Sequence, residues 1–121
     1  MASSLAFAQQ PDLDRRLGEI RDYIRFVPAR AERQLVQLSA QARSADPRTK
    51  GDFLYLLCQS KRALGEKAQA ATLADELLAL GRRHQDDVLI AKGLLSKAYV
   101  AFAMNELTAS HQLAWEAERL A

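Results

Sequence analysis

The fold is decided by residues 51–121, which fall into two similar units. The first unit, 51–90, reads GDFLYLLCQSKRALGEKAQAATLADELLALGRRHQDDVLI, and the second, 91–121, reads AKGLLSKAYVAFAMNELTASHQLAWEAERLA. At an offset of 40 residues, small residues match small ones and apolar residues match apolar ones at most positions. The matches include Gly65 with Asn105, Cys58 with Ala98, Lys67 with Leu107, Ala70 with Ser110, Ala74 with Ala114, Leu77 with Ala117 and Leu80 with Leu120. This pattern indicates a helical hairpin that occurs twice.

The composition favours helix along the rest of the chain as well. Apolar residues make up 49% and charged residues 26% of the 121 positions, with only 3 Pro and 5 Gly. Strand-forming runs of alternating Val, Ile and Thr are missing, and Ala and Leu are abundant. This is the composition of a folded globular domain rich in helix formers, so we expect one all-α domain.

Capping residues and apolar spacing predict six helices. Their expected ranges are 12–26, 29–43, 47–64, 66–82, 86–104 and 106–121. Gly65 and Asn105 suit the left-handed residue that ends a helix, while Asp46 and Asp86 suit helix N-caps. The predicted buried stripes are Leu13, Leu17, Ile20 and Ile24; Ala31, Leu35, Leu38 and Ala42; Ala70, Leu73, Ala74, Leu77 and Leu78; and Leu107, Ser110, Leu113, Ala114, Ala117 and Leu120. Residues 86–104 are apolar nearly all round and predict the most buried helix.

The two ends of the sequence suggest a part of a longer protein. Residues 1–11 form an expected flexible N-terminus, and Ala6 and Ala8 have the spacing that precedes signal-peptide cleavage. They are either the remnant of a signal peptide or an Ala-rich frayed end. At the other end, the helix of residues 106–121 is amphipathic with no capping helix after it. Either it contacts a second subunit in a homodimer, or the native protein continues, which is the interpretation we prefer.

From charge and apolar patterning we expect neither a nucleic-acid partner nor membrane insertion. The formal charge is +2, from 17 basic and 15 acidic residues, whereas a nucleic-acid-binding domain concentrates far more positive charge on one face. No apolar run reaches the roughly 18 residues of a transmembrane helix, so we expect no membrane insertion. The basic cluster at Arg15, Arg16, Arg21, Arg25, Arg30 and Arg33 either engages an acidic partner or lipid head groups or is an ordinary charged face, and the interspersed acidic residues favour the second interpretation.

Catalytic and metal-binding patterns are missing. Cys58 is the single cysteine, and its position at a helix crossing favours a small buried side chain over a reactive thiol. His84 and His111 have no convergent partners of the kind that zinc requires. The sequence has no glycine-rich phosphate loop and no nucleophile elbow. We therefore expect no cofactor, no metal and no enzymatic activity in this region.

The paired helices, tight Gly and Asn turns and small crossing residues resemble tetratricopeptide repeats. Leu95, Ala98 and Tyr99 resemble the signature of that repeat's first helix, and Ala114 and Ala117 the small positions of its second. The period of 40 residues exceeds the usual value of about 34, and the first-helix tryptophan and terminal proline of the repeat are missing. The resemblance covers 47–121 well and 12–43 weakly. It implies a right-handed α-solenoid of about three antiparallel hairpins.

The resemblance also implies where a partner would bind. Repeats of this kind bind proteins or peptides in a concave groove lined by their first helices, here those of residues 12–26, 47–64 and 86–104. The candidate partner-binding residues are Tyr55, Gln59, Arg62, Tyr99, Phe102 and Trp115. For Trp115 two alternatives stay open: an exposed binding residue, or a filler between the last two helices.

Residues 77–117 look like the repeats that precede diguanylate cyclase (GGDEF) or histidine kinase domains in bacterial signalling proteins. That resemblance implies a sensor module, placed in the periplasm or outside the cytoplasm if the signal-like start is real, and in the cytoplasm otherwise. The alternative is a free-standing adaptor or chaperone that holds a peptide. For the fold, we expect Leu in place of Ala98 or Ala114 to destabilise the domain by about 1–3 kcal/mol through overpacking.

Overall fold

The chain is all-α, as predicted. The computed structural model describes residues 2–120, with side chains from residue 11 onward, and within that range it contains six helices and no strand. The helices are α1 (Ala2–Tyr23), α2 (Pro28–Arg43), α3 (Pro47–Ala63), α4 (Lys67–Arg83), α5 (Asp87–Ala103) and α6 (Leu107–Leu120). Helices α2 to α6 agree with their predicted ranges to within one or two residues.

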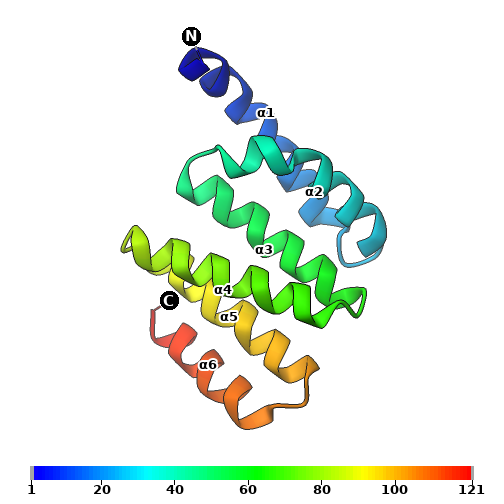
Figure 1. The fold of residues 1–121 in the computed structure, drawn as a ribbon, viewed down its shortest axis with the longest axis vertical. Helices are drawn as coiled ribbons and strands as arrows, with labels where there is room; N and C mark the ends of the chain where they lie inside the picture. Colours follow the sequence, from blue (N-terminus) through cyan, green and yellow to red (C-terminus); the bar gives the residue numbers. More distant parts are fainter. Residues whose placement is uncertain (1, 121) are drawn as a thin grey trace.

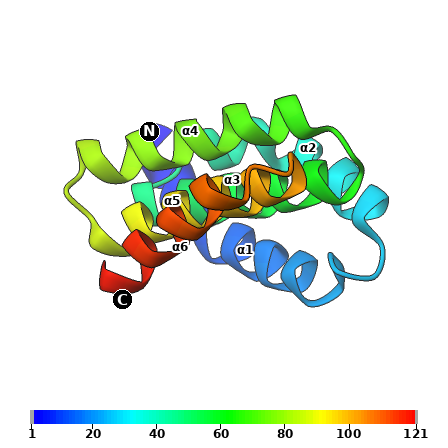
Figure 2. The same cartoon turned by 90° about the horizontal axis from the view of Figure 1, so that it is seen from below.

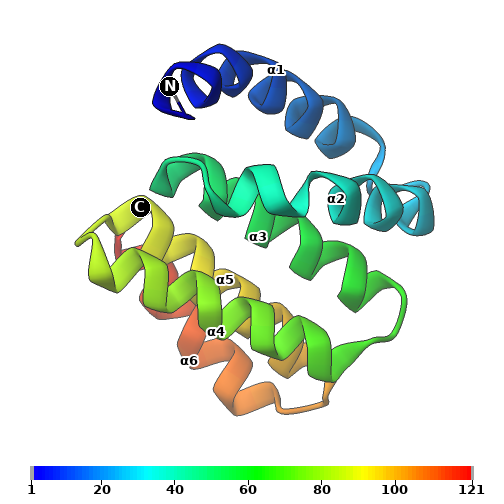
Figure 3. The same ribbon diagram turned by 45° about the horizontal axis from the view of Figure 1, so that its top comes forward.

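The helices follow one another in chain order along the long axis of the molecule. Figure 1 shows α1 at one end of the stack and α6 at the other, and the turned view in Figure 3 shows the same order. Each helix packs against the next, and α3 also contacts both α1 and α5. Seen from the α6 end, α4 and α1 lie on opposite sides of the stack (Figure 2). The odd-numbered helices α1, α3 and α5 therefore adjoin one another along one side.

A step of 20 residues underlies the 40-residue repeat. Helices α3 to α6 begin at Pro47, Lys67, Asp87 and Leu107. Before each of the last three, one residue has positive φ: Gly65 at 80°, Gln85 at 50° and Asn105 at 62°. In all three turns this residue donates to the carbonyl three residues back, and the next residue donates to the carbonyl five back. That is the Schellman arrangement, so three consecutive helix ends are built alike.

The first helix begins ten residues earlier than the sequence predicts. The Pro11-Asp12 pair indicates a start near Asp12, but α1 begins at Ala2 and Pro11 lies inside it. Proline lacks the amide hydrogen that would bond to the carbonyl of residue 7. The residues before it contain neither Gly nor another Pro and include three alanines, so the helix continues through the gap. Asp12 is therefore not a helix cap.

The core runs through the first four helices and confirms their predicted stripes. The first predicted stripe, Leu13, Leu17 and Ile20 of α1 with Ile24 directly after it, is at most 3% exposed, and the stripes of α2 and α4 are also buried. Phe53 of α3 is fully enclosed and is the largest such side chain. The main cluster of buried residues joins α1, α2, α3 and α4 and reaches Leu89 and Val100 of α5. Burial on this scale supplies most of the free energy that holds the helices together.

The last two helices are less covered than the sequence predicts. On α5, which we expected to be the most buried helix, Tyr99 is 43% and Phe102 67% exposed. Helix α3 has more buried positions. Of the predicted α6 stripe only Ala117 is buried, while Leu107 is 56% exposed. The reason is positional: α6 ends the stack, and α5 is the one helix of the described chain that packs on it.

Candidate functional site

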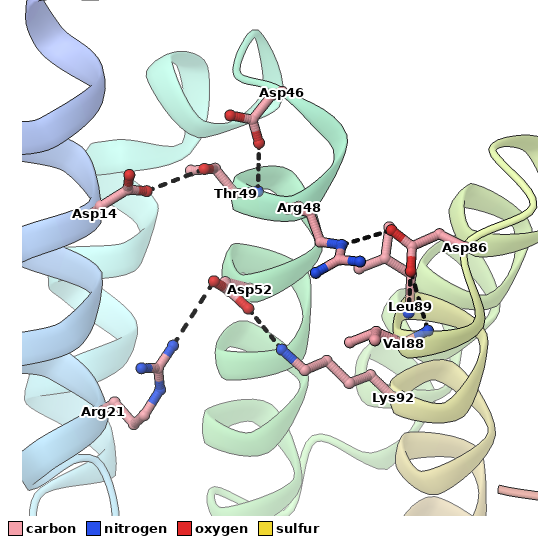
Figure 4. A network of polar contacts seen from close by, with 10 residues as sticks. All are labelled: Asp14, Arg21, Asp46, Arg48, Thr49, Asp52, Asp86, Val88, Leu89 and Lys92. Atoms are coloured by element: carbon pink, nitrogen blue, oxygen red, sulfur yellow. Dashed lines mark hydrogen bonds and ion pairs between the residues drawn. The ribbon is translucent and has the colours of Figure 1, made fainter. Parts of the chain in front are cut away.

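A network of charged side chains fixes the spacing of α1, α3 and α5 (Figure 4). Arg48 of α3 donates to Asp86 at 2.6 Å, and Asp52 of α3 bonds to Lys92 of α5 at 2.8 Å. Arg21 of α1 lies 3.8 Å from the second carboxylate oxygen of Asp52. One carboxylate, Asp52, thus bridges the neighbouring helices on both of its sides and neutralises two cations.

The same network includes two predicted N-caps. The Asp46 carboxylate accepts from the backbone amide of Thr49 at 2.8 Å, and Asp86 accepts from Val88 at 3.0 Å. Thr49 also donates to Asp14 of α1 at 3.0 Å. The hydrogen bond from Arg48 lowers the pKa of Asp86 below its usual value. At Asp86, therefore, local capping and the contact between helices depend on the same side chain.

Beside this network, α3, α5 and the turn that follows α1 line a hollow of about 270 Å³. Its lining consists of Arg25 from the turn that follows α1, Tyr55, Cys58, Gln59 and Arg62 from α3, and Ser96 and Tyr99 from α5. Four predicted partner-binding residues, Tyr55, Gln59, Arg62 and Tyr99, are brought together here. We refer to this site as the polar hollow.

The polar hollow is electropositive. The guanidinium carbon of Arg62 lies 4.5 Å from the centre of the Tyr99 ring, which orients this cation. Among residues 11–120 no carboxylate lies within 4 Å of the guanidinium nitrogens of Arg25 or Arg62, in contrast to Arg21 and Lys92, which share Asp52. Two cations in one hollow, with tyrosine hydroxyls and an amide nearby, suit an anionic ligand.

Cys58 contributes to the floor of the hollow and packs as a small buried side chain. It is 1% exposed, and its thiol donates to the carbonyl oxygen of Ala70 at 3.3 Å. Burial raises the pKa of the thiol, with Arg62 acting in the opposite direction. A buried thiol with a raised pKa is a poor nucleophile. The prediction of a crossing residue is confirmed for this position.

The other two predicted residues lie elsewhere. Phe102, on α5, is 67% exposed and does not line the polar hollow. Trp115 is 56% exposed, so it does not fill the space between α5 and α6. It lies instead at a separate hollow of about 440 Å³ on the outer face of these helices, which we call the end hollow. Its lining is Ala91, Lys92 and Leu95 from α5 and His111, Ala114, Trp115, Ala117 and Glu118 from α6.

Sequence reasoning missed Arg25 and Ser96 as members of the polar hollow. Arg25 counted only as part of a dispersed basic cluster, because nothing in its neighbourhood marks it apart from Arg21 or Arg30. Its position opposite Arg62 depends on how α1 packs across α3. The one signal in the sequence is that it stands four residues after Arg21, which reaches Asp52.

His84 and His111 are exposed. Residues 11–120 hold no group of three or more His, Cys, Asp or Glu side chains that could bind a metal ion. In the same range none of the helices has the length and apolar character needed to cross a bilayer. No protein-family model matches the chain, and neither a curated protein nor a solved structure does.

Proposed function

We propose that the chain is a non-catalytic protein-binding module that holds an acidic segment of its partner in the polar hollow. The observation that carries this proposal is the pair of arginines, Arg25 of the α1–α2 turn and Arg62 of α3, which line one hollow without carboxylate partners within 4 Å among the described residues. A guanidinium group binds a carboxylate through two parallel hydrogen bonds. Two of them in one hollow favour a glutamate or aspartate side chain or a terminal carboxylate.

The size of the polar hollow favours a peptide over a cofactor. Its volume of about 270 Å³ lies below the roughly 300–1,000 Å³ of typical small-molecule sites. It therefore holds one or two side chains of a longer ligand. Tyr99 and Phe102 follow one another along the exposed face of α5 and offer aromatic surface to the next residue of such a segment. An acidic residue followed by an apolar one is the motif we expect.

We propose a TPR-like right-handed α-solenoid of about three hairpins as the architecture behind this site. Its support is the 20-residue step from α3 to α6 and the adjacency of the odd-numbered helices. By resemblance, the module acts as a sensor in a bacterial signalling protein, ahead of a diguanylate cyclase or a histidine kinase, outside the cytoplasm. The second candidate is a free-standing adaptor or chaperone, which the convergence of Arg25 and Arg62 favours equally.

The binding proposal is tested with two labelled decapeptides, one of alternating Glu and Tyr and the other of alternating Gln and Tyr. Fluorescence anisotropy should show binding of the Glu peptide that weakens as salt rises. Replacing Arg25 or Arg62 with Ala should weaken it at least about tenfold, because each change leaves a carboxylate poorly paired. Arg33, an exposed arginine of α2, supplies the matched control R33A. Equal affinity for both peptides, or an R33A loss equal to that of R62A, contradicts the proposal.

Fractionation of the source cells separates the two biological settings. Antibody raised against the chain would detect a band much heavier than 13.5 kDa in the membrane fraction if it belongs to a sensor protein. A soluble band near 13.5 kDa would contradict that setting and leave the adaptor.

A further inference from the structure

We infer that the end hollow is the contact surface of a two-fold symmetric dimer, in which the α6 helices of two copies pair antiparallel. This goes beyond the proposed function, because it concerns the α6 end of the stack and no residue of the polar hollow. The end hollow has an apolar floor of Ala91, Leu95, Ala114 and Ala117, with the half-exposed Trp115 beside it. Figure 2 shows α6 at the near end of the stack.

Elsewhere in the same chain, a surface of this kind is covered by a helix. The corresponding surface of α3 and α4, 40 residues earlier, is covered by α5. There Gly93 lies against the backbone of Leu78, and a Cβ at Gly93 would come within 2.6 Å of the Leu78 Cα. On α5 and α6 the matching surface keeps its small residues, since Ala91 matches Gly51 and Ala114 matches Ala74.

The end hollow does not suit a helix like α5, because two positions that are apolar on α4 are polar on α6. His111 stands where α4 has Ala71, and Glu118 stands where α4 has the buried Leu78. Both line the end hollow, and neither has an ion-pair partner within 4 Å among residues 11–120. The third polar residue of the lining, Lys92, is already bonded to Asp52. The surface therefore fits a partner with complementary charges at the same spacing.

A second copy of α6 meets that requirement. In an antiparallel pair centred between Ala114 and Trp115, His111 faces Glu118 of the second copy, and the two-fold axis makes this contact twice. The same register places Trp115 against Ala114 of the other copy, where the small residues leave room for the ring. A parallel pair would bring Glu118 onto Glu118 and the two tryptophans onto each other. Charge complementarity thus selects the antiparallel arrangement.

The register is tested by charge exchange in sedimentation equilibrium of the full chain from about 1 to 500 µM at pH 6. We expect reversible dimerisation, since one helix pair gives a small interface. E118K places a lysine against His111, and H111E places two glutamates together, so each should weaken dimerisation at least about tenfold. The double variant H111E/E118K exchanges the two charges and should restore dimerisation to within about threefold of the wild type.

Two further variants keep the test specific. E116K makes the same chemical change two residues from Glu118, on the side of α6 that lines other hollows, and should leave dimerisation unchanged. W115A should weaken it at least about tenfold, because tryptophan is the residue most enriched among interface hot spots, and circular dichroism checks that its fold is kept. A wild-type chain that is monomeric throughout, or a double variant no better than its single variants, would overturn the proposal. R25A, by contrast, should dimerise normally, so this test is independent of peptide binding.

Discussion

The hydroxyl of Ser110 donates a 2.7 Å hydrogen bond to the carbonyl oxygen of Ala98, across the crossing of α6 and α5. Forty residues earlier, Cys58 donates to the carbonyl oxygen of Ala70 across the crossing of α3 and α4. Because Ala98 matches Cys58 and Ser110 matches Ala70, the two hairpins make the same contact from opposite helices. Each crossing combines one alanine with one small polar side chain, so the backbones approach closely while the bond bridges them.

The first prediction concerns that bond. Replacing Ser110 with Ala removes the donor and should lower the free energy of unfolding by about 0.5–1.5 kcal/mol, measured by urea denaturation. T72A is the matched control, because the Thr72 hydroxyl bonds to Ala68 within its own exposed helix face. It should be neutral or slightly stabilising, since Ala has the higher helix propensity. An equal loss in both variants would show that the bond between helices contributes nothing.

Local signals in the sequence predicted the helices because helix ends and buried stripes depend on near neighbours. Gly65, which lacks a Cβ, and Asn105 are residue types that tolerate positive φ, and Asp46 and Asp86 carry the acceptor that an N-cap needs. Gln85 has the same positive φ, and its residue type does not signal it. Gln85 takes this conformation because it stands at the turn position of the 20-residue step, where the Schellman hydrogen bonds form. Side-chain type alone therefore identified two of the three turns.

The candidate sites were less predictable because they depend on which helix covers which. Arg25 and Arg62 are 37 positions apart in the sequence and line the same hollow only because α1 packs against α3. The exposure of Trp115 likewise depends on the absence of a helix over α6 in the described chain, which residue spacing within α6 does not encode. Periodicity gives the buried face of a helix, and tertiary packing decides how much of that face is covered.

The left-handed turns give a second prediction. Q85G should stabilise the fold by about 0.5–1 kcal/mol, because a non-glycine residue pays a steric cost at φ of 50° that glycine does not. N105G should gain less, since asparagine tolerates this conformation. G65A should lose about 1 kcal/mol at the matching position. Thermal and urea melts of the three variants would reveal the order, and a destabilised Q85G would show that its side chain has another role.

Close approach of α5 to α4 gives a third prediction. A Cβ at Gly93 would lie 2.6 Å from the Leu78 Cα and 2.8 Å from its nitrogen, and backbone atoms cannot move aside alone. G93A should therefore destabilise the fold by about 1–3 kcal/mol. Gly18 is the internal control, because its Cβ would meet nothing within 4 Å. G18A should stabilise helix α1 by about 0.5–1 kcal/mol. Replacing Gly with Ala should thus lower the free energy of unfolding at position 93 and raise it at position 18.

Acid stability gives a fourth prediction. The hydrogen bond from Arg48 lowers the pKa of Asp86 below 3.8 in the folded chain, so the unfolded chain binds this proton more readily. The resulting stabilisation is fully present above about pH 4 and is lost as pH falls through the lowered pKa. D86N keeps an N-cap acceptor and loses the charge. It should be less stable than the wild type at pH 7, with a difference that shrinks in acid, whereas D87N should show a smaller difference. If the difference in free energy of unfolding between D86N and the wild type stayed constant from pH 7 to pH 2, the lowered pKa of Asp86 would not contribute to stability.

The fifth prediction separates two alanines that the sequence treats alike. Ala98 is 2% exposed beneath Ser110, so A98L should cost about 1–3 kcal/mol by overpacking the crossing. Ala114 is half-buried and lines the end hollow, where a leucine side chain has room to extend. A114L should therefore change the free energy of unfolding of the monomer by less than about 0.5 kcal/mol.

For dimerisation we expect the opposite order, with A114L more disruptive than A98L. In the proposed dimer Trp115 of one copy lies against Ala114 of the other, so A114L fills the space that the ring needs and should weaken dimerisation. The measurements are urea melts at low micromolar concentration, where the monomer dominates, and sedimentation at high concentration. If A114L lowered the free energy of unfolding as much as A98L, Ala114 would belong to the tightly packed α5–α6 crossing. An A114L variant that melts normally and dimerises normally would move the dimer contact away from the end hollow, because Ala114 and Trp115 are the residues of that surface nearest the two-fold axis.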